Sequence, residues 1–123
     1  MTLTVRRRDE VEVYRTLDGS EIRELLHPDH SPTRNQSLAE ATLQPGQRTH
    51  AHRHVSSEEI YYILEGSGRM TLGRDSFPVV RGDSLLIPPG TVHCIENAGQ
   101  APLRILCCCA PPYAHSDTEL VEA

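Results

Sequence analysis

The sequence contains no tryptophan, few aromatic residues and no long apolar run. Aromatic residues make up 4% and hydrophobic residues 37% of its 123 residues, so we expect a thin, aliphatic core. A chain of this size still buries roughly two thirds of its unfolded surface and has the length of one domain, placed here over residues 1–123. No apolar stretch approaches the ~20 residues of a membrane-spanning helix, and the polar start lacks the apolar region of a signal peptide. We therefore expect a cytoplasmic protein with no membrane partner.

Positive charge is also scarce. The formal net charge is −5 at pH 7, whereas a nucleic-acid partner requires a basic face. The only basic run, Arg6 to Arg8, is too short to outweigh that balance. We expect no nucleic-acid partner.

Four cysteines are present, but no CxxC spacing. Thiols stay reduced in the cytoplasm, and neighbouring strand residues point to opposite faces, so adjacent members of the run from Cys107 to Cys109 do not readily form disulfides. We interpret them as small buried apolar residues. A redox or metal role for Cys107 and Cys109, which share a face, is the alternative.

Helical periodicity is nearly absent, and short strand-like segments alternate with turns. The turns carry pairs such as Pro45-Gly46 and Pro89-Gly90, in which proline sets φ and glycine accepts a positive φ. Short strands at a spacing of about ten residues favour a sandwich or closed barrel. The acidic, proline-broken segment after residue 109 either caps one end of the barrel or frays. The predicted strands are 21–26, 37–43, 49–54, 58–64, 68–73, 75–80, 83–88, 91–97 and 103–109.

The segment THAHRHVSSEEIYYILEG (49–66) places three histidines at alternate positions. Residues i and i+2 of a strand share a face roughly 6.5–7 Å apart, so two imidazoles there can converge on one ion. A hairpin after His54 would bring Glu58 or Glu59 alongside as an oxygen ligand. Face parity cannot be carried across the turn, so the pair among His50, His52 and His54, and the glutamate, stay open. The alternative is a solvated polar face.

A second segment, GDSLLIPPGTVHCIEN (82–97), contains an apolar strand, a Pro-Gly turn and then His93. A lone histidine is usually structural. This one follows a turn that folds it back toward a sheet already carrying His-x-His. The second segment therefore favours a metal site.

The two segments together resemble the two motifs of the cupin superfamily. The first motif is Gly, five residues, His-x-His, three or four residues, Glu, six residues, Gly; residues 46–66 match it with Gly46, His52, His54, Glu59 and Gly66. The second is Gly, five residues, Pro-x-Gly, two residues, His, three residues, Asn; residues 82–97 match it with Gly82, Pro88, Gly90, His93 and Asn97. Both fit without a gap, and the ordered pair is far more specific than either motif alone.

The resemblance implies an all-β fold, the double-stranded β-helix or jelly-roll barrel. It also implies that one divalent transition metal is bound by His52, His54, Glu59 and His93. It leaves His50 outside the ligand set and turns Glu58 outward.

Three imidazoles and one carboxylate, without thiolate, suit Fe, Mn, Ni, Co or Cu, and also Zn. An octahedral ion would keep two positions for water, oxygen or a chelating substrate. Tyr61 shares the face of Glu59 and is the candidate catalytic residue; it either hydrogen-bonds a substrate or fills the barrel.

Cupins with this ligand set include dioxygenases, oxalate-type decarboxylases, sugar-phosphate isomerases, polyketide cyclases and proteins that only bind ligands, and the fold does not choose among them. Only Arg48 and Arg53 lie near the motifs, which disfavours a sugar phosphate. We expect a metal-dependent, dioxygenase-like enzyme acting on a small oxygen-rich organic molecule. The alternatives are a non-catalytic barrel that binds or senses a metal or small ligand, and an isomerase-like or decarboxylase-like cupin.

The resemblance also suggests a homodimer. We expect its interface to include the segment 21–43, whose strand edge would otherwise be exposed to aggregation.

Overall fold

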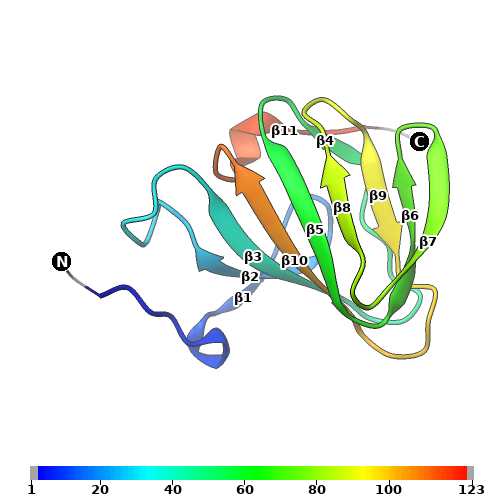
Figure 1. Cartoon of the computed structure of the whole chain (residues 1–123), viewed down its shortest axis with the longest axis horizontal. Coiled ribbons are helices and arrows are strands. Elements are labelled where there is room, and N and C mark those ends of the chain that lie inside the picture. Colours follow the sequence, from blue (N-terminus) through cyan, green and yellow to red (C-terminus); the bar gives the residue numbers. More distant parts are fainter. Residues whose placement is uncertain (1–2, 122–123) are drawn as a thin grey trace.

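The chain folds into two antiparallel sheets that face each other (Figure 1), which confirms the predicted all-β class. The computed structural model describes residues 3–121. The first sheet has six strands in the order β1 (Val13–Arg15), β2 (Glu21–Leu26), β3 (Ser37–Leu43), β10 (Leu103–Ala110), β5 (Glu58–Glu65) and β8 (Ser84–Ile87). The second has five strands in the order β11 (Thr118–Leu120), β4 (His52–His54), β9 (His93–Glu96), β6 (Ser67–Leu72) and β7 (Asp75–Val80).

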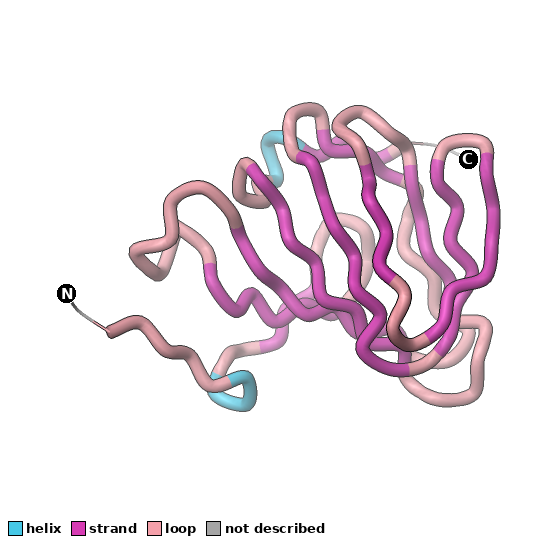
Figure 2. The backbone as a smooth tube through the Cα atoms, viewed as in Figure 1, coloured by secondary structure: helices cyan, strands magenta, loops and turns pink. Residues whose placement is uncertain are grey.

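Two short 3-10 helices, η1 (Arg8–Glu10) and η2 (His115–Asp117), complete the described part of the chain. Strands and the loops that join them at the ends of the sheets form nearly all of the backbone (Figure 2). No helix within residues 3–121 is long and apolar enough to cross a membrane.

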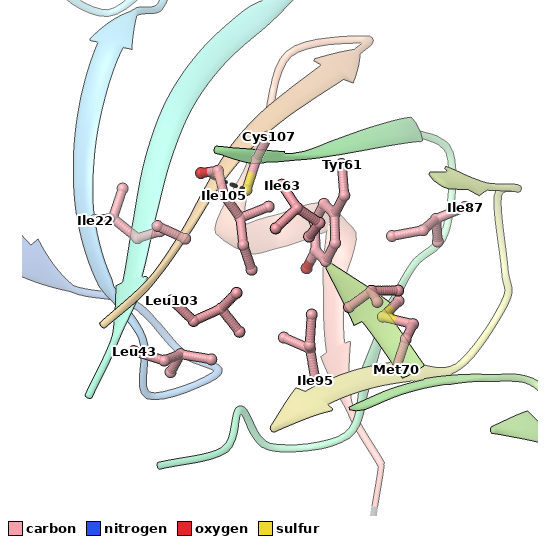
Figure 3. Close-up of a cluster of buried hydrophobic side chains, with 12 residues drawn as sticks. Ile22, Leu43, Tyr61, Ile63, Met70, Ile87, Ile95, Leu103, Ile105 and Cys107 are labelled. Carbon is pink, nitrogen blue, oxygen red and sulfur yellow. Dashed lines mark hydrogen bonds between the residues drawn. The ribbon is translucent and has the colours of Figure 1, made fainter. Parts of the chain in front are cut away.

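The core lies between the two sheets because their strands bury every second residue. In β10, Leu103, Ile105, Cys107 and Cys109 are buried, while the residues between them are partly exposed. The core is aliphatic, as the composition predicts (Figure 3). Its most deeply buried members are Leu43, Ile63, Met70, Ile87, Ile95, Leu103 and Ile105.

Gly66, the last glycine of the first motif, joins β5 to β6 at a point where only glycine fits. Its φ is +86°, a left-handed conformation that other residues rarely adopt. A Cβ there would also lie 2.6 Å from the carbonyl oxygen of Pro102. The turn is therefore packed directly against the chain that leads into β10.

The predicted strands all correspond to observed ones, but two begin at least two residues later than predicted. The strand expected over 49–54 covers only His52–His54, and the one expected over 91–97 covers His93–Glu96. Thr49 still donates its backbone N–H to the carbonyl of Ile95 at 3.0 Å, so the chain runs beside β9 before β4 begins.

The sequence did not predict β1 and β11, the outermost strands on one side of each sheet. Each has three residues and is mostly exposed, so neither carries an apolar pattern. β1 pairs with residues 21–23 of β2 and so covers the first half of the edge that was expected to be free within 21–43. β11 pairs with β4, so the C-terminal segment caps the barrel there.

Candidate metal centre

Three strands from both sheets bring the four predicted ligands together. His52 and His54 lie on β4, His93 begins β9, and Glu59 is the second residue of β5. Their exposed fractions are 2%, 4%, 0% and 5% respectively. The three histidines each offer a ring nitrogen within 4.8 Å of the others. His52 is the register partner of His93, which explains how motifs far apart in sequence meet.

Backbone carbonyls orient two of the imidazole rings. The Nδ1 of His52 lies 2.8 Å from the carbonyl oxygen of His50, and the Nδ1 of His93 lies 3.0 Å from that of Thr91. A carbonyl only accepts, so each ring carries its proton on Nδ1. Each Nε2 therefore presents a lone pair to the interior, as a metal-ligating histidine requires.

Thr118 orients the third ring. Its hydroxyl donates to the carbonyl of Ala114 at 2.9 Å, so its oxygen accepts the Nδ1 proton of His54 at 3.0 Å. The Nε2 of His54 therefore also presents a lone pair. It lies 3.1 Å from Oε1 of Glu59, another atom that accepts hydrogen bonds.

The ring nitrogens and the carboxylate oxygen that meet at the centre are all hydrogen-bond acceptors, and none of them donates to another. The Nε2 of His93 is buried without a hydrogen-bond partner among the described residues, 3.5 Å from Oε1 of Glu59. Unsatisfied buried acceptors cost free energy, and facing lone pairs repel. A cation between them removes both costs, so the donor set fits a metal ion.

Charge at the centre supports the same conclusion. Burial alone would raise the pKa of Glu59, but His54 and His93 hold it at about 2 when a proton on their Nε2 atoms takes the place of the ion. Burial, and then the neighbouring His93, lowers the pKa of His52. Near neutral pH the site thus holds a carboxylate and a neutral His52 imidazole, the forms that bind metal.

The centre opens into a cavity between the sheets. Aliphatic side chains form one part of its wall, and Tyr61 lies on the same side as Glu59, its ring centroid 6.0 Å from that of His93. Burial raises the pKa of Tyr61 well above its usual value, so its hydroxyl remains a donor. Tyr113, from the segment before η2, packs edge-on against His54 with centroids 5.7 Å apart.

Other candidates lie outside this cluster. His50 and Glu58 are exposed, as the resemblance implies. Arg53 is also exposed and pairs with Glu119 at 2.7 Å.

The thiol of Cys109 donates to Oε2 of Glu59 at 3.3 Å. Burial, then the charge of Glu59, raises the pKa values of Cys107 and Cys109 above the usual range, so both stay protonated. Among the described residues, the group whose ligand atoms all lie within 4.8 Å of one another contains the three histidines and neither a cysteine nor Glu59. Glu59 still places Oε1 3.1 Å from Nε2 of His54 and 3.5 Å from that of His93.

Sequence reasoning missed Asp18, Tyr113 and Thr118. All three line the cavity, but they come from the β1–β2 turn and the C-terminal segment. Their distance along the chain from both motifs left no local spacing to reveal them.

Comparison with known proteins identifies the arrangement. The cupin domain profile matches residues 39–109. The chain belongs to the cupin family. An uncharacterized protein of Methanocaldococcus jannaschii is 56% identical to this cupin over 114 residues, which cover 93% of this chain and 91% of that one.

Two further relatives carry functional names. The oxalate-binding protein of Thermotoga maritima is 33% identical over 86 residues, covering 70% of this cupin and 71% of that protein. The solved structure of a predicted oxalate decarboxylase from Thermotoga maritima superposes with a TM-score of 0.78 at 28% identity, over 88% of this cupin and 99% of that chain.

Proposed function

We propose that this cupin holds one divalent transition-metal ion and uses it to bind a small oxygen-rich organic molecule in the cavity between the sheets. The proposed ligands are the Nε2 atoms of His52, His54 and His93 and the carboxylate of Glu59. The observation that carries the proposal is that the Nδ1 atoms of all three histidines form hydrogen bonds with oxygen atoms of neighbouring residues. Their Nε2 lone pairs are therefore left to face the proposed ion. Fe, Mn, Ni, Co, Cu and Zn all suit this set.

A bound ion would supply Lewis acidity, polarising an oxygen atom of its ligand. The protein's own residues do the rest. Leu43, Ile95 and Ile105 form an apolar wall that limits water, and Tyr61 offers a protonated hydroxyl to an oxygen of the bound molecule. We assign Tyr61 this orienting role.

We propose turnover of the bound molecule by an oxygenase-type reaction, since the ligand set resembles the facial site of non-haem iron oxygenases with one histidine added. A second candidate is a barrel that binds its ligand without turnover, which the oxalate-binding name of the Thermotoga relative favours. The decarboxylase title of the solved structure supports a third reaction class on the same site.

Metal content provides the first test. We expect elemental analysis to find about one transition-metal ion per chain and His93→Ala to remove it, because the other three ligands then leave the ion undercoordinated. His50→Ala is the matched control and should keep the ion, since His50 is exposed. Normal metal content in His93→Ala would contradict the ligand assignment.

Ligand access provides the second test. Catechols, diketones and keto acids are added to the Fe(II) or Mn(II) form, and we expect at least one of these classes to change its absorption or paramagnetic resonance spectrum. Glu59→Gln should weaken both the response and metal retention, since it removes the anionic ligand. Oxygen uptake with the same compounds separates turnover from binding. If no chelator changes the metal spectrum, the ion is enclosed. The enzyme proposal would then be replaced by the alternative of a barrel without turnover.

A further inference from the structure

The turn between β1 and β2 brings a second carboxylate to the metal centre. Thr16 and Ser20 close this turn, with the N–H of Thr16 donating to the carbonyl of Ser20 at 3.1 Å. The carbonyl of Asp18 accepts the N–H of His50 at 2.7 Å, which ties the turn to the segment before β4. The side chain of Asp18, only 14% exposed, then lies with Oδ2 3.6 Å from Nε2 of His52.

Hydrogen bonds fix the orientation of this carboxylate. Oδ1 of Asp18 accepts from the hydroxyl of Thr16 at 2.6 Å, and from the N–H and hydroxyl of Ser20 at 2.9 and 2.6 Å. These three bonds satisfy Oδ1 and hold the plane of the group. Oδ2 faces the cavity beside His52, whose ring centroid lies 4.2 Å from that of His93, and the buried Nε2 of His93 lacks a partner among the described residues. Oδ2 is therefore a preorganised acceptor next to the ion.

Within residues 3–121, the cavity lining gives an anionic ligand no arginine or lysine to pair with. The lining includes the carboxylates of Asp18, Glu24 and Glu59. The arginines of the same hairpin are engaged elsewhere: Arg15 donates to the carbonyl of Gly19 at 2.6 Å and Arg23 to that of Val11 at 2.8 Å. Asp18 and Glu59 alone match the charge of a divalent ion, so an anionic ligand adds uncompensated negative charge.

We propose that Asp18 selects the ligand of the centre: its Oδ2 accepts a hydrogen bond from a hydroxyl of the molecule bound beside the ion, so the site prefers neutral, hydroxyl-bearing molecules to carboxylate anions. This inference rests on the proposed metal-dependent function. A hydroxyl donor satisfies the free oxygen, whereas a carboxylate placed there meets a like charge in a site of low dielectric.

The test uses the full chain and the change Asp18→Asn. Asparagine keeps a carbonyl oxygen to accept the three bonds of the turn, and replaces the free acceptor with an NH2 donor. Asp75→Asn is the matched control, because Asp75 is exposed at the start of β7. Each protein is loaded with Co(II), and metal content is measured first. Dissociation constants for glycolamide and glycolate, which have the same shape and differ in charge, are then measured from the Co(II) absorption spectrum.

We expect Asp18→Asn to retain the ion and to shift the affinity ratio of glycolate over glycolamide about tenfold or more toward glycolate, with Asp75→Asn unchanged. An unchanged ratio would overturn the inference, since Asp18 would then only support its turn. Loss of the ion from Asp18→Asn would also overturn it, because Asp18 would then be a metal ligand. A wild-type chain that fails to hold Co(II) instead rejects the proposed function, at a step before any ligand is added.

Discussion

The thiols of Cys107 and Cys109 differ from those of Cys94 and Cys108 in their surroundings. The first pair is buried and its pKa values are raised by burial and by the charge of Glu59, whereas the second pair is partly exposed. Since the thiolate is the reactive form, we predict that iodoacetamide modifies Cys94 and Cys108 first, with the metal retained. Mass spectrometry and metal analysis over time check this, with denatured protein as the control for full modification. Rapid loss of metal would show that a buried thiol holds the ion.

At the residue scale, the spacing within the two motifs predicted which side chains meet at the candidate metal centre. His52, His54 and His93 lie together with Glu59 beside the last two, and their role as metal ligands stays a prediction. Strand geometry alone could not separate His50 from the other histidines, because all three share the same parity. The structure separates them because β4 begins only at His52. Asp18 was not predictable, because its approach depends on how a distant hairpin packs.

At the scale of elements, β11 supports the ligand strand β4, and Asp117 holds the start of β11 in place. Its carboxylate accepts the backbone N–H groups of Ser56 and Ser57 at 2.9 and 3.1 Å, just after β4. Burial would raise the pKa of Asp117, but these hydrogen bonds lower it below its ordinary value. The carboxylate therefore helps to fix both the β4–β5 turn and the strand that contacts His54.

We predict that Asp117→Asn lowers the free energy of unfolding by about 1 kcal/mol at neutral pH, allowing for solvent screening of this partly exposed group. The folded-state pKa is below the unfolded value of about 3.9. The stabilisation is thus complete above that value and is lost as pH falls through the folded-state pKa. Urea unfolding of both proteins at pH 7 and near pH 3 measures the difference. A difference that does not shrink in acid would contradict the prediction.

The elements that the sequence missed are short and lie on the outside of their sheets. β1 and β11 have three residues each, too few to show alternation, and proline residues stand close before β11. Long strands such as β5 and β10 were predicted because alternate burial of eight residues leaves a clear period of two. Such short strands form because a neighbouring strand pairs with them, and this pairing is visible only in the folded chain.

At the scale of the whole molecule, the outer face of the first sheet carries an apolar patch, defined here by Ile60, Tyr62 and Leu86. Their exposed fractions are 45%, 43% and 54%, and Ile60 and Leu86 are register partners on β5 and β8. The free edge expected within 21–43 is covered by β1 over residues 21–23. This patch is therefore a better candidate for the interface of the expected homodimer.

We predict a dimer by light scattering at micromolar concentration, and a monomer that retains metal for Ile60→Glu, because a charge in an apolar interface opposes its burial. Val80→Glu is the control, since Val80 is at least as exposed as Ile60 but lies on β7 of the other sheet. A monomeric wild-type protein would reject the dimer, and a dimeric Ile60→Glu would reject this patch as its interface.

The proposed ligands come from both sheets, with Glu59 on one and the three histidines on the other. An ion held by all four would therefore join the sheets much as a cross-link does, and only in the folded chain. An ion present at a thousand times its dissociation constant adds about 4.1 kcal/mol to the free energy of unfolding. The lifetime of the protein in a cell would then follow the supply of metal, since chains made under metal starvation unfold more often and are exposed to proteases.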